Sequence, residues 1–250
     1  MYDPDILKML SQAEALPKVA IPAAMRNLHP LVQVTKDGLE NATVDNDNMV
    51  SPYRTDDIPF LTIHVSKESV RRSLLFVDTL IKTIEKVGGK VKAEKIHWQT
   101  KSTVEFGGMN IATLRLRERY KQKKRDPDPK DRWHRQTMEH IPTGLLVLDS
   151  GPSYLSSDFH CQDTDKGQRI EDEINRLVID WIRQAGRARI SKREAAEARK
   201  REEEQERIRR EREAEVKRRR DELHKEQKSE QAKVDRLLSE ASNWQQSQTL

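Results

Sequence analysis

The stretch RLRERYKQKKRDPDPKDRWHR, residues 115–135, concentrates positive charge in a chain whose charges are otherwise nearly balanced. It holds ten Lys or Arg against four Asp or Glu, a net charge of +6, whereas the whole chain of 250 residues carries +5. Clustered Lys and Arg side chains bind nucleic acids, because neutralising a phosphate releases its condensed counterions. The stretch therefore predicts a polyanion-binding surface. The alternatives are a solvated loop between two strands and a docking site for an acidic protein.

Alternation in the first half of this stretch favours a strand with a basic face. Arg115, Arg117 and Arg119 recur at every second residue, and side chains with that spacing point to one side of a strand. No row of aromatic residues accompanies them, so contacts with backbone phosphates are expected rather than stacking on single-stranded bases. The predicted nucleic-acid-binding residues are Lys101, Arg115, Arg117, Arg119, Lys121, Lys123, Lys124, Arg125, Arg132 and Arg135.

Patterns for catalysis or metal binding are weak. The sequence has neither a G-x-G-x-x-G nor a G-x-x-x-x-G-K-[ST] loop for cradling phosphates. DPDPK, residues 126–130, is similar to a nuclease signature, but metal-dependent catalysis needs carboxylates fixed around the ion rather than crowded into a Pro-broken turn. His160, Cys161 and Asp163 lie close in sequence, yet a zinc site needs four well-placed ligands. We therefore predict a non-enzymatic protein with no resident metal or cofactor.

Apolar periodicity predicts an α+β domain over residues 58–186. Apolar and polar residues alternate in 61–65, as in a half-buried strand. Two amphipathic helices are predicted at 67–87 and 168–185, because their apolar residues recur every three or four positions. We expect both helices to pack on one face of an antiparallel-rich sheet, in the order strand, helix, about four strands, helix. The predicted sheet residues of the core are Ile63, Val65, Val104, Leu114 and Leu116.

The hairpin that follows the first of these helices has a predictable register. A three-residue loop at 107–109 places Val104 opposite Ala112 and Thr100 opposite Leu116, so that each face stays uniformly apolar or polar. A two-residue turn mixes the faces. Register follows the buried face, so we predict the longer loop with a bulge.

This register places cations opposite each other on the polar face. Lys101 is expected opposite Arg115, and Gln99 opposite Arg117. Like charges directly opposite on a sheet are unfavourable. Either solvent screens them or an anion lies between them, which agrees with a phosphate-binding face.

Helical segments flank this domain on both sides. Residues 1–57 predict a helical arm followed by a loop, with Asp3 as an N-cap and Pro4 at the first helical position. Residues 187–250 predict one long charged helix, stabilised by Glu-to-Lys or Glu-to-Arg pairs four residues apart. We interpret this helix as a spacer or a partner-docking arm. A short heptad-like seam near its end predicts binding of a protein partner or self-association through Val234, Leu237, Ala241 and Trp244.

Composition narrows the class of protein further. Charged residues make up 36% of the chain, against roughly 25% in an ordinary soluble domain. Cys161 is the single cysteine, so no intramolecular disulfide is expected. The N-terminus does not read as a secretory signal, and no apolar run approaches the ~20 residues that span a bilayer. We predict a cytoplasmic protein that does not bind membranes.

Several segments resemble a family of uncharacterised bacterial proteins. The resemblance covers about residues 26–244, which match the middle of that family. Its longer members resemble helix-turn-helix proteins near the N-terminus, so the resemblance implies an association with DNA but no activity. The segments are HPLV (29–32), LTIHVSKESVRRSLLFVDTLIKTIEKVGGKV (61–91), LRLRERY (114–120), IPTGLLVL (141–148), IEDEINRLVIDWI (170–182) and LLSEASNW (237–244).

These observations predict a non-enzymatic binding module associated with nucleic acid. The basic sheet face and the basic stretch after it are expected to contact phosphates, and the long helix is expected to hold a second element at a distance. The alternative is a protein–protein interaction scaffold that binds no nucleic acid.

Overall fold

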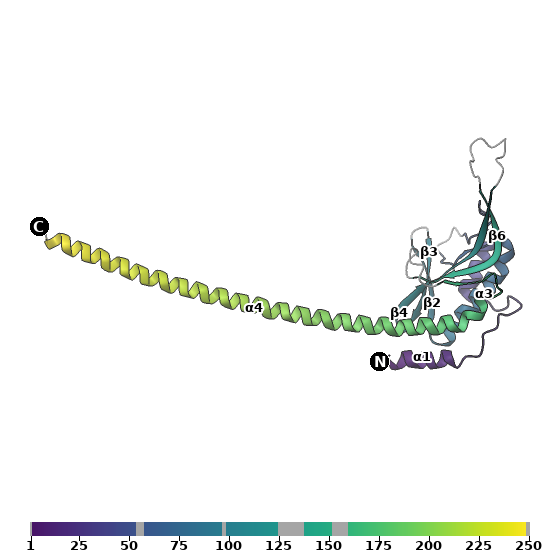
Figure 1. Ribbon diagram of the computed structural model, residues 1–250, viewed down its shortest axis with the longest axis horizontal. Helices are drawn as coiled ribbons and strands as arrows, with labels where there is room; N and C mark the ends of the chain where they lie inside the picture. The colour runs from purple at the N-terminus through teal and green to yellow at the C-terminus, as the bar shows by residue number, and fades with distance from the viewer. Residues whose placement is uncertain (1, 54–57, 97–98, 125–137, 152–159, 249–250) are drawn as a thin grey trace, which may run out of the picture. The chain divides into compact units, whose positions relative to one another are not determined.

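The computed structural model describes residues 2–53, 58–96, 99–124, 138–151 and 160–248. The chain divides into two compact units, Met1–Ser191 and Lys192–Leu250. The first unit contains all of the strands and the core, and the second contains the greater part of the last helix (Figure 1).

Helices begin where the sequence carries start signals. Pro4 and Pro30 occupy first helical positions. A backbone N–H at this position has no acceptor within the helix, so proline removes no hydrogen bond there. The side chain of His29 accepts a hydrogen bond from the Leu31 N–H at 3.2 Å and so caps the second helix. The helices predicted at 67–87 and 168–185 are confirmed, each preceded by a short 3₁₀ turn. The elements are α1 (Pro4–Glu14), α2 (Pro30–Glu40), η1 (Lys67–Ser69), α3 (Val70–Lys86), η2 (Ile170–Glu173) and α4 (Ile174–Gln248).

The strands confirm the α+β class, but they form two sheets rather than one. The four-stranded sheet has the order β1-β5-β6-β7, and the three-stranded sheet has the order β2-β3-β4. All pairs are antiparallel except β1 with β5. The strands are β1 (Thr62–His64), β2 (Lys90–Ile96), β3 (Gln99–Phe106), β4 (Met109–Thr113), β5 (Arg115–Lys124), β6 (Met138–Asp149) and β7 (His160–Gln162).

The predicted hairpin register is correct near the turn. Val104 lies opposite Ala112, as predicted, but the turn is shorter than predicted, because Phe106 pairs with Met109. A bulge after Val104 shifts the register by one residue. The two-residue turn and the Val104–Ala112 pair are therefore both possible, and the buried face stays uniform. Gly107 and Gly108 both have positive φ, the backbone conformation that a two-residue hairpin turn requires.

The predicted register fails beyond Leu114, because the chain changes sheets there. The Leu114 N–H still donates to the Ser102 carbonyl at 2.8 Å, but Arg115 pairs with Thr62 and Asp149 in the other sheet. Leu116 accordingly lies opposite Ile63 and Leu148, and not opposite Thr100.

The predicted opposition of cations is therefore also wrong. Lys101 lies opposite Glu94 of β2, whereas Arg115 lies opposite Thr62 and Asp149 in the other sheet. Gln99 pairs with Ile96 and not with Arg117. The residues between them, His97 and Trp98, lie outside the described part of the chain.

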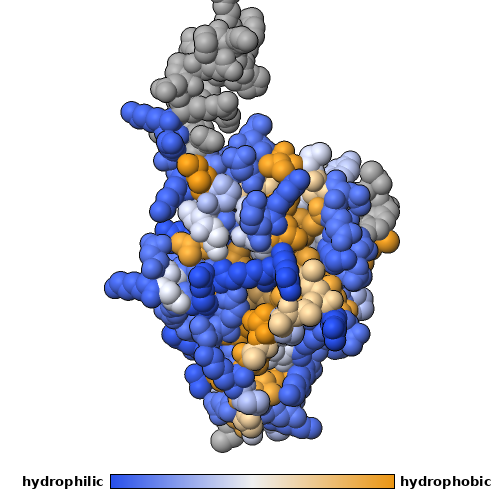
Figure 2. Space-filling model, turned by 90° about the vertical axis from the view of Figure 1, so that its right-hand side faces the viewer, coloured by the Kyte–Doolittle hydropathy of each residue, from blue (hydrophilic) through white to orange (hydrophobic). Residues whose placement is uncertain are grey.

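The core of the first unit contains the residues that periodicity predicted. Ile63, Val65, Val104, Leu114 and Leu116 are buried in one cluster with apolar residues of α3 and of the beginning of α4. Trp181, Phe76 and Phe106 are among the largest fully buried side chains. On the face shown in Figure 2, hydrophilic side chains surround a central band of apolar ones.

The N-terminal helix is part of this unit, and Arg189 attaches it to α4. Ile6 of α1 is fully buried. The Arg189 guanidinium donates to the Gly107 carbonyl at 2.7 Å and to the Asp5 carboxylate at 2.8 Å, and Asp3 lies 3.2 Å away. A single side chain thus joins α1, the β3–β4 turn and α4.

Replacing Arg189 with alanine is expected to lower the free energy of unfolding of the first unit by about 1–2 kcal/mol. Hydrogen bonds to charged groups contribute roughly 1.5–3 kcal/mol, and partial exposure reduces that value. Urea denaturation measures the loss, and the amides of α1 are expected to exchange faster with solvent. Arg187→Ala is the matched control, because Arg187 is exposed; an equal loss in both variants would exclude the proposed attachment.

The second unit is a helix whose described side chains are exposed as far as residue 240. Ion pairs one turn apart stabilise it, including Glu206–Arg210 at 2.6 Å and Glu215–Arg219 at 2.8 Å. Val234 and Leu237 of the predicted seam are exposed. Ala241 and Trp244 lie in the helix, but their side chains are outside the described part. Among the described residues, no helix is both long and apolar enough to cross a lipid bilayer.

Candidate nucleic-acid interface

The basic strand continues into a two-stranded ribbon. β1 pairs only with residues 115–117 of β5, and β7 pairs only with residues 147–149 of β6. Beyond these points β5 and β6 pair with each other alone, from Tyr120 opposite Pro142 to Lys124 opposite Met138. We call residues 119–124 and 138–143 the ribbon arm. In Figure 1 it rises from the sheet beside the β6 label, and its length is about 20 Å at about 3.3 Å per residue.

A buried carboxylate fixes the base of the ribbon arm. Glu118 is only 2% exposed. Its Oε2 accepts hydrogen bonds from the Ser66 N–H at 2.9 Å and the Ser66 hydroxyl at 2.7 Å, and its Oε1 accepts one from the Gly144 N–H at 2.5 Å. Gly144 has positive φ and lies where the register of β5 and β6 shifts. Glu118 thus connects the bulge in β6 to Ser66, the residue before η1, through hydrogen bonds.

Sequence reading did not identify Glu118 as a structural residue. The available signal was its position in the alternation of the strand. Glu118 follows Leu116 by two residues and therefore lies on the buried side of β5. A carboxylate at such a position requires hydrogen-bond donors, and a β-bulge and the residue that precedes a helix supply them here.

The cations at the base of β5 are largely neutralised. Arg117 Nε donates to Asp149 Oδ2 at 2.7 Å, and Arg115 lies opposite Asp149 in the register. His64 lies beside Arg117 and contacts Asp45 at 2.8 Å. The predicted basic sheet face is thus a mixture of cations and carboxylates near β1.

The cations of the ribbon arm are different, because they have no such partners. Arg119, Lys121, Lys123 and Lys124 are exposed, and none of them forms an ion pair with another described residue. By contrast, Lys82 binds Asp78 at 2.7 Å. Four cations in six residues of β5, against the single carboxylate of Glu139 in the β6 part of the arm, therefore leave a net positive charge at the arm.

The other predicted binding residues are separated from this group or lie outside the described residues. Lys101 belongs to β3 in the three-stranded sheet. Arg125, Arg132, Arg135 and the segment 126–130 lie outside the described part of the chain. The structure thus places the exposed cations of the described strand in the ribbon arm and separates Lys101 from them.

The two sides of the ribbon arm differ. Arg119, Lys121 and Lys123 lie on one side of β5, and Tyr120, Gln122 and Lys124 lie on the other. On the second side, the His140 ring packs against Tyr120 at a tilt of 39°, with ring centroids 4.1 Å apart, and its Nε2 lies 3.1 Å from Gln122 Nε2. Asp47 also contacts the His140 ring. We call the first the lysine side and the second the histidine side.

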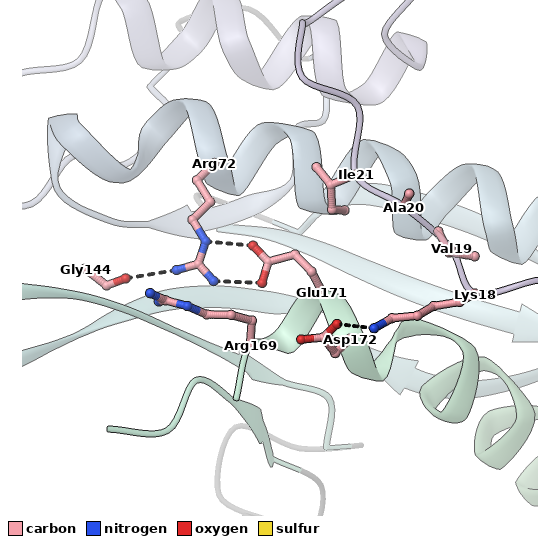
Figure 3. A pocket seen from close by; sticks show the side chains of 9 residues that line it. All are labelled: Lys18, Val19, Ala20, Ile21, Arg72, Gly144, Arg169, Glu171 and Asp172. Carbon is pink, nitrogen blue, oxygen red and sulfur yellow. Dashed lines mark hydrogen bonds and ion pairs between the residues drawn. The ribbon is translucent and has the colours of Figure 1, made fainter. Parts of the chain in front are cut away.

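A cavity of about 720 Å³ is the other candidate site, and a charge cluster forms one of its walls (Figure 3). Arg72 donates to both oxygens of Glu171 at 2.7 Å, to both oxygens of Asp163 at 2.6 and 2.9 Å, and to the Gly144 carbonyl at 3.0 Å. All five guanidinium N–H groups of Arg72 thus have partners. Burial alone would lower the pKa of Arg72, but the hydrogen bonds with Glu171 and Asp163 raise it instead.

The remaining charges around the cavity cancel. Lys18 pairs with Asp172 at 2.7 Å, and Arg169 lies 3.5 Å from Asp163, which also binds Arg72. The three cations therefore face three carboxylates. Val19, Ala20 and Ile21 provide the apolar lining (Figure 3). We interpret the cluster as a structural brace, because it offers no unbalanced charge to a ligand.

Among the described side chains, the residues considered for metal or nucleophilic chemistry do not form a site; the side chain of His160 and the segment 126–130 lie outside them. Burial, together with the nearby carboxylates of Glu173 and Asp163, raises the pKa of Cys161 to about 11, so its reactive thiolate is scarce at neutral pH. Asp163 is occupied by Arg72 and by the backbone N–H groups of Leu146 and Ile170. Across the described ranges, no three His, Cys, Asp or Glu side chains gather as metal ligands would.

The ribbon arm thus combines exposure with cations that form no ion pair among the described side chains, whereas the charges around the cavity balance. This distribution of charge suits binding of an anion at the arm, and it suits a structural role for the charged residues at the cavity. Comparisons with protein-family models, with curated proteins and with solved structures give no match for this chain.

Proposed function

We propose that the protein is a non-enzymatic module that binds nucleic acid through the ribbon arm. The observation that carries the proposal is the group of four exposed cations, Arg119, Lys121, Lys123 and Lys124, without carboxylate partners among the described residues. Nucleic-acid phosphates supply the missing negative charge, and counterion release supplies the free energy. The α4 helix beyond Ser191 then serves as a spacer or docks a partner.

The distribution of charge elsewhere supports this assignment. Residues 191–228 hold 15 Lys or Arg interleaved with 12 Asp or Glu, and many of them pair along the helix, as Arg219 and Glu215 do. That helix therefore presents little net charge to a polyanion. The ribbon arm presents its cations on β5, which is paired with β6 and anchored to the core at its base, so fewer degrees of freedom are lost on binding.

Replacing Arg119, Lys121, Lys123 and Lys124 with glutamine is expected to weaken binding of duplex DNA of any sequence. Each lost phosphate contact lowers the slope of log K against log salt by about 0.9, so loss of all four lowers it by up to about 3.6. Fluorescence anisotropy titrations at several salt concentrations measure the slope. The fold is expected to survive, because exposed charges contribute little to stability.

A matched control removes four cations from the second unit. Arg199, Lys200, Lys217 and Arg220 are exposed in α4, and their replacement with glutamine is expected to leave the DNA affinity nearly unchanged. Absence of DNA binding at about 50 mM salt by the unmodified protein would refute the proposal. A loss of binding in the α4 variant alone would assign it to the helix.

The alternative, an interaction scaffold without nucleic acid, also has an observation in its favour. Val234, Leu237 and Leu238 are 48%, 64% and 63% exposed, and Val234 and Leu237 have the a-to-d spacing of a helix–helix seam. Such a seam suits a second copy of the chain or another helix. It is compatible with a DNA-binding arm in the first unit.

A further inference from the structure

We infer that the ribbon arm enters the major groove of duplex DNA with its lysine side toward the base pairs. The inference rests on the proposed function and specifies the form of nucleic acid and the side of the arm. Three observations on the arm carry it: its two-strand width, its exposure, and the difference between its sides.

The width of the arm matches the major groove of B-form DNA. Between Tyr120–Pro142 and Lys124–Met138, neither β5 nor β6 pairs with a third described strand. Two strands lie about 4.8 Å apart, and the B-form major groove, about 12 Å wide, admits a two-stranded ribbon. The A-form duplex of RNA has a deep and narrow major groove that side chains cannot reach. The geometry therefore favours DNA.

The histidine side is engaged with another part of the protein. Asp47 contacts His140 Nδ1 and the Asn48 side chain donates to the His140 carbonyl at 3.0 Å. The loop that carries these residues is tied together by Asp45 Oδ1, which accepts the N–H groups of Asp47 and Met49 at 2.9 Å. Its carboxylates repel phosphates, and the loop occupies space beside the arm.

The cations of the lysine side and Ile141 are exposed and offer two kinds of contact. Lys121 lies opposite Ile141, which is 41% exposed. Arg119 and Lys123 flank Lys121 on the same strand side, and Lys123 lies opposite Glu139 in the register. Arg and Lys donate to the O6 and N7 acceptors of guanine, and apolar side chains contact the methyl group of thymine. This side thus has the donors and the apolar surface that a groove floor accepts.

Lys123 and Lys124 provide a matched pair for the test. They are neighbours with equal charge and both are exposed, but they lie on opposite sides of β5. Lys123→Gln is expected to weaken binding of a 24-base-pair DNA about tenfold, a change in the range of one specific base contact. Lys124→Gln removes a phosphate contact but no contact with the groove floor, so it is expected to weaken binding by a clearly smaller factor than Lys123→Gln does. Competition with an RNA duplex of the same sequence, followed by anisotropy, is expected to show at least about tenfold weaker binding than DNA.

The possible outcomes separate this inference from the proposed function. Equal losses in the two lysine variants would overturn the assignment of the side, and equal affinity for DNA and RNA would overturn entry into the major groove. In both cases the arm would still be a nucleic-acid-binding element. Failure of the unmodified protein to bind either duplex would refute the proposed function itself.

Discussion

Replacing Asp163 with alanine is expected to lower the free energy of unfolding of the first unit by about 3–5 kcal/mol, the usual cost of removing one partner from a buried ion pair. Asp163 is fully buried, and its carboxylate accepts two hydrogen bonds from Arg72 and one each from the backbone N–H groups of Leu146 and Ile170. The alanine variant leaves these donors without their acceptor. Urea denaturation followed by circular dichroism measures the loss.

The pH dependence of this effect has a definite sign. Burial acts to raise the pKa of Asp163, but the hydrogen bonds from Arg72 and the backbone outweigh it, so the folded pKa lies below the ordinary value of 3.8. A lowered pKa means that the stabilisation is complete above the unfolded value and is lost as the pH falls through the folded value. The difference between wild type and Asp163→Ala is therefore expected to be constant from about pH 5 to 8 and to shrink on acidification.

An exposed pair provides the control for this prediction. Asp172 pairs with Lys18 on the rim of the same cavity, where both side chains are largely exposed. Asp172→Ala is expected to leave the free energy of unfolding unchanged within error, because solvent screens such a pair. Equal losses in the two variants, or a loss with Asp163→Ala below about 1 kcal/mol, would exclude the buried cluster as a brace.

Leu74→Ala is expected to destabilise the first unit by about 2–5 kcal/mol. Leu74 is 1% exposed on α3, and deletion of a buried leucine side chain removes apolar burial and leaves a cavity. Leu177→Ala in α4 is expected to have a similar effect, because Leu177 is buried in the same cluster. Chemical denaturation monitored by the fluorescence of the buried Trp181 reports both variants.

Leu7→Ala is the matched control for the core variants. Leu7 lies on α1 but is 45% exposed, so its truncation is expected to cost less than about 1 kcal/mol. A loss below about 1 kcal/mol for Leu74→Ala would place the stabilising core elsewhere.

Local patterns in the sequence were sufficient for the helices and for part of the hairpin. The spacing of apolar residues in 67–87 and 168–185 is set by the helix itself, and the Val104–Ala112 pair follows from the need to keep one face buried. The change of sheet at Leu114 has no such local signal. Ala112, Leu114 and Leu116 keep the same alternation across the break, and the choice of strand partner depends on Thr62, far away in sequence.

The candidate site was predictable in composition but not in arrangement. The sequence shows that cations alternate along β5, yet the neutralisation of Arg117 depends on Asp149, 32 residues away. The division of the arm into two sides depends on Asp47 and His140, which are 93 residues apart. Contacts between residues so far apart in sequence are set by the topology of the fold. A count of charges along the chain gives no information about them.

The parallel pairing of β1 with β5 has a consequence for the order of folding. It joins Thr62 to Arg115, 53 residues apart, and the segment that closes this loop contains α3 and the whole three-stranded sheet. The β2-β3-β4 meander needs only short hairpin closures, which take about 1–10 μs, whereas pairing over a long separation must first overcome a larger loss of chain entropy. We therefore expect the meander to form early and the closure of β1 onto β5 to be a later and slower event.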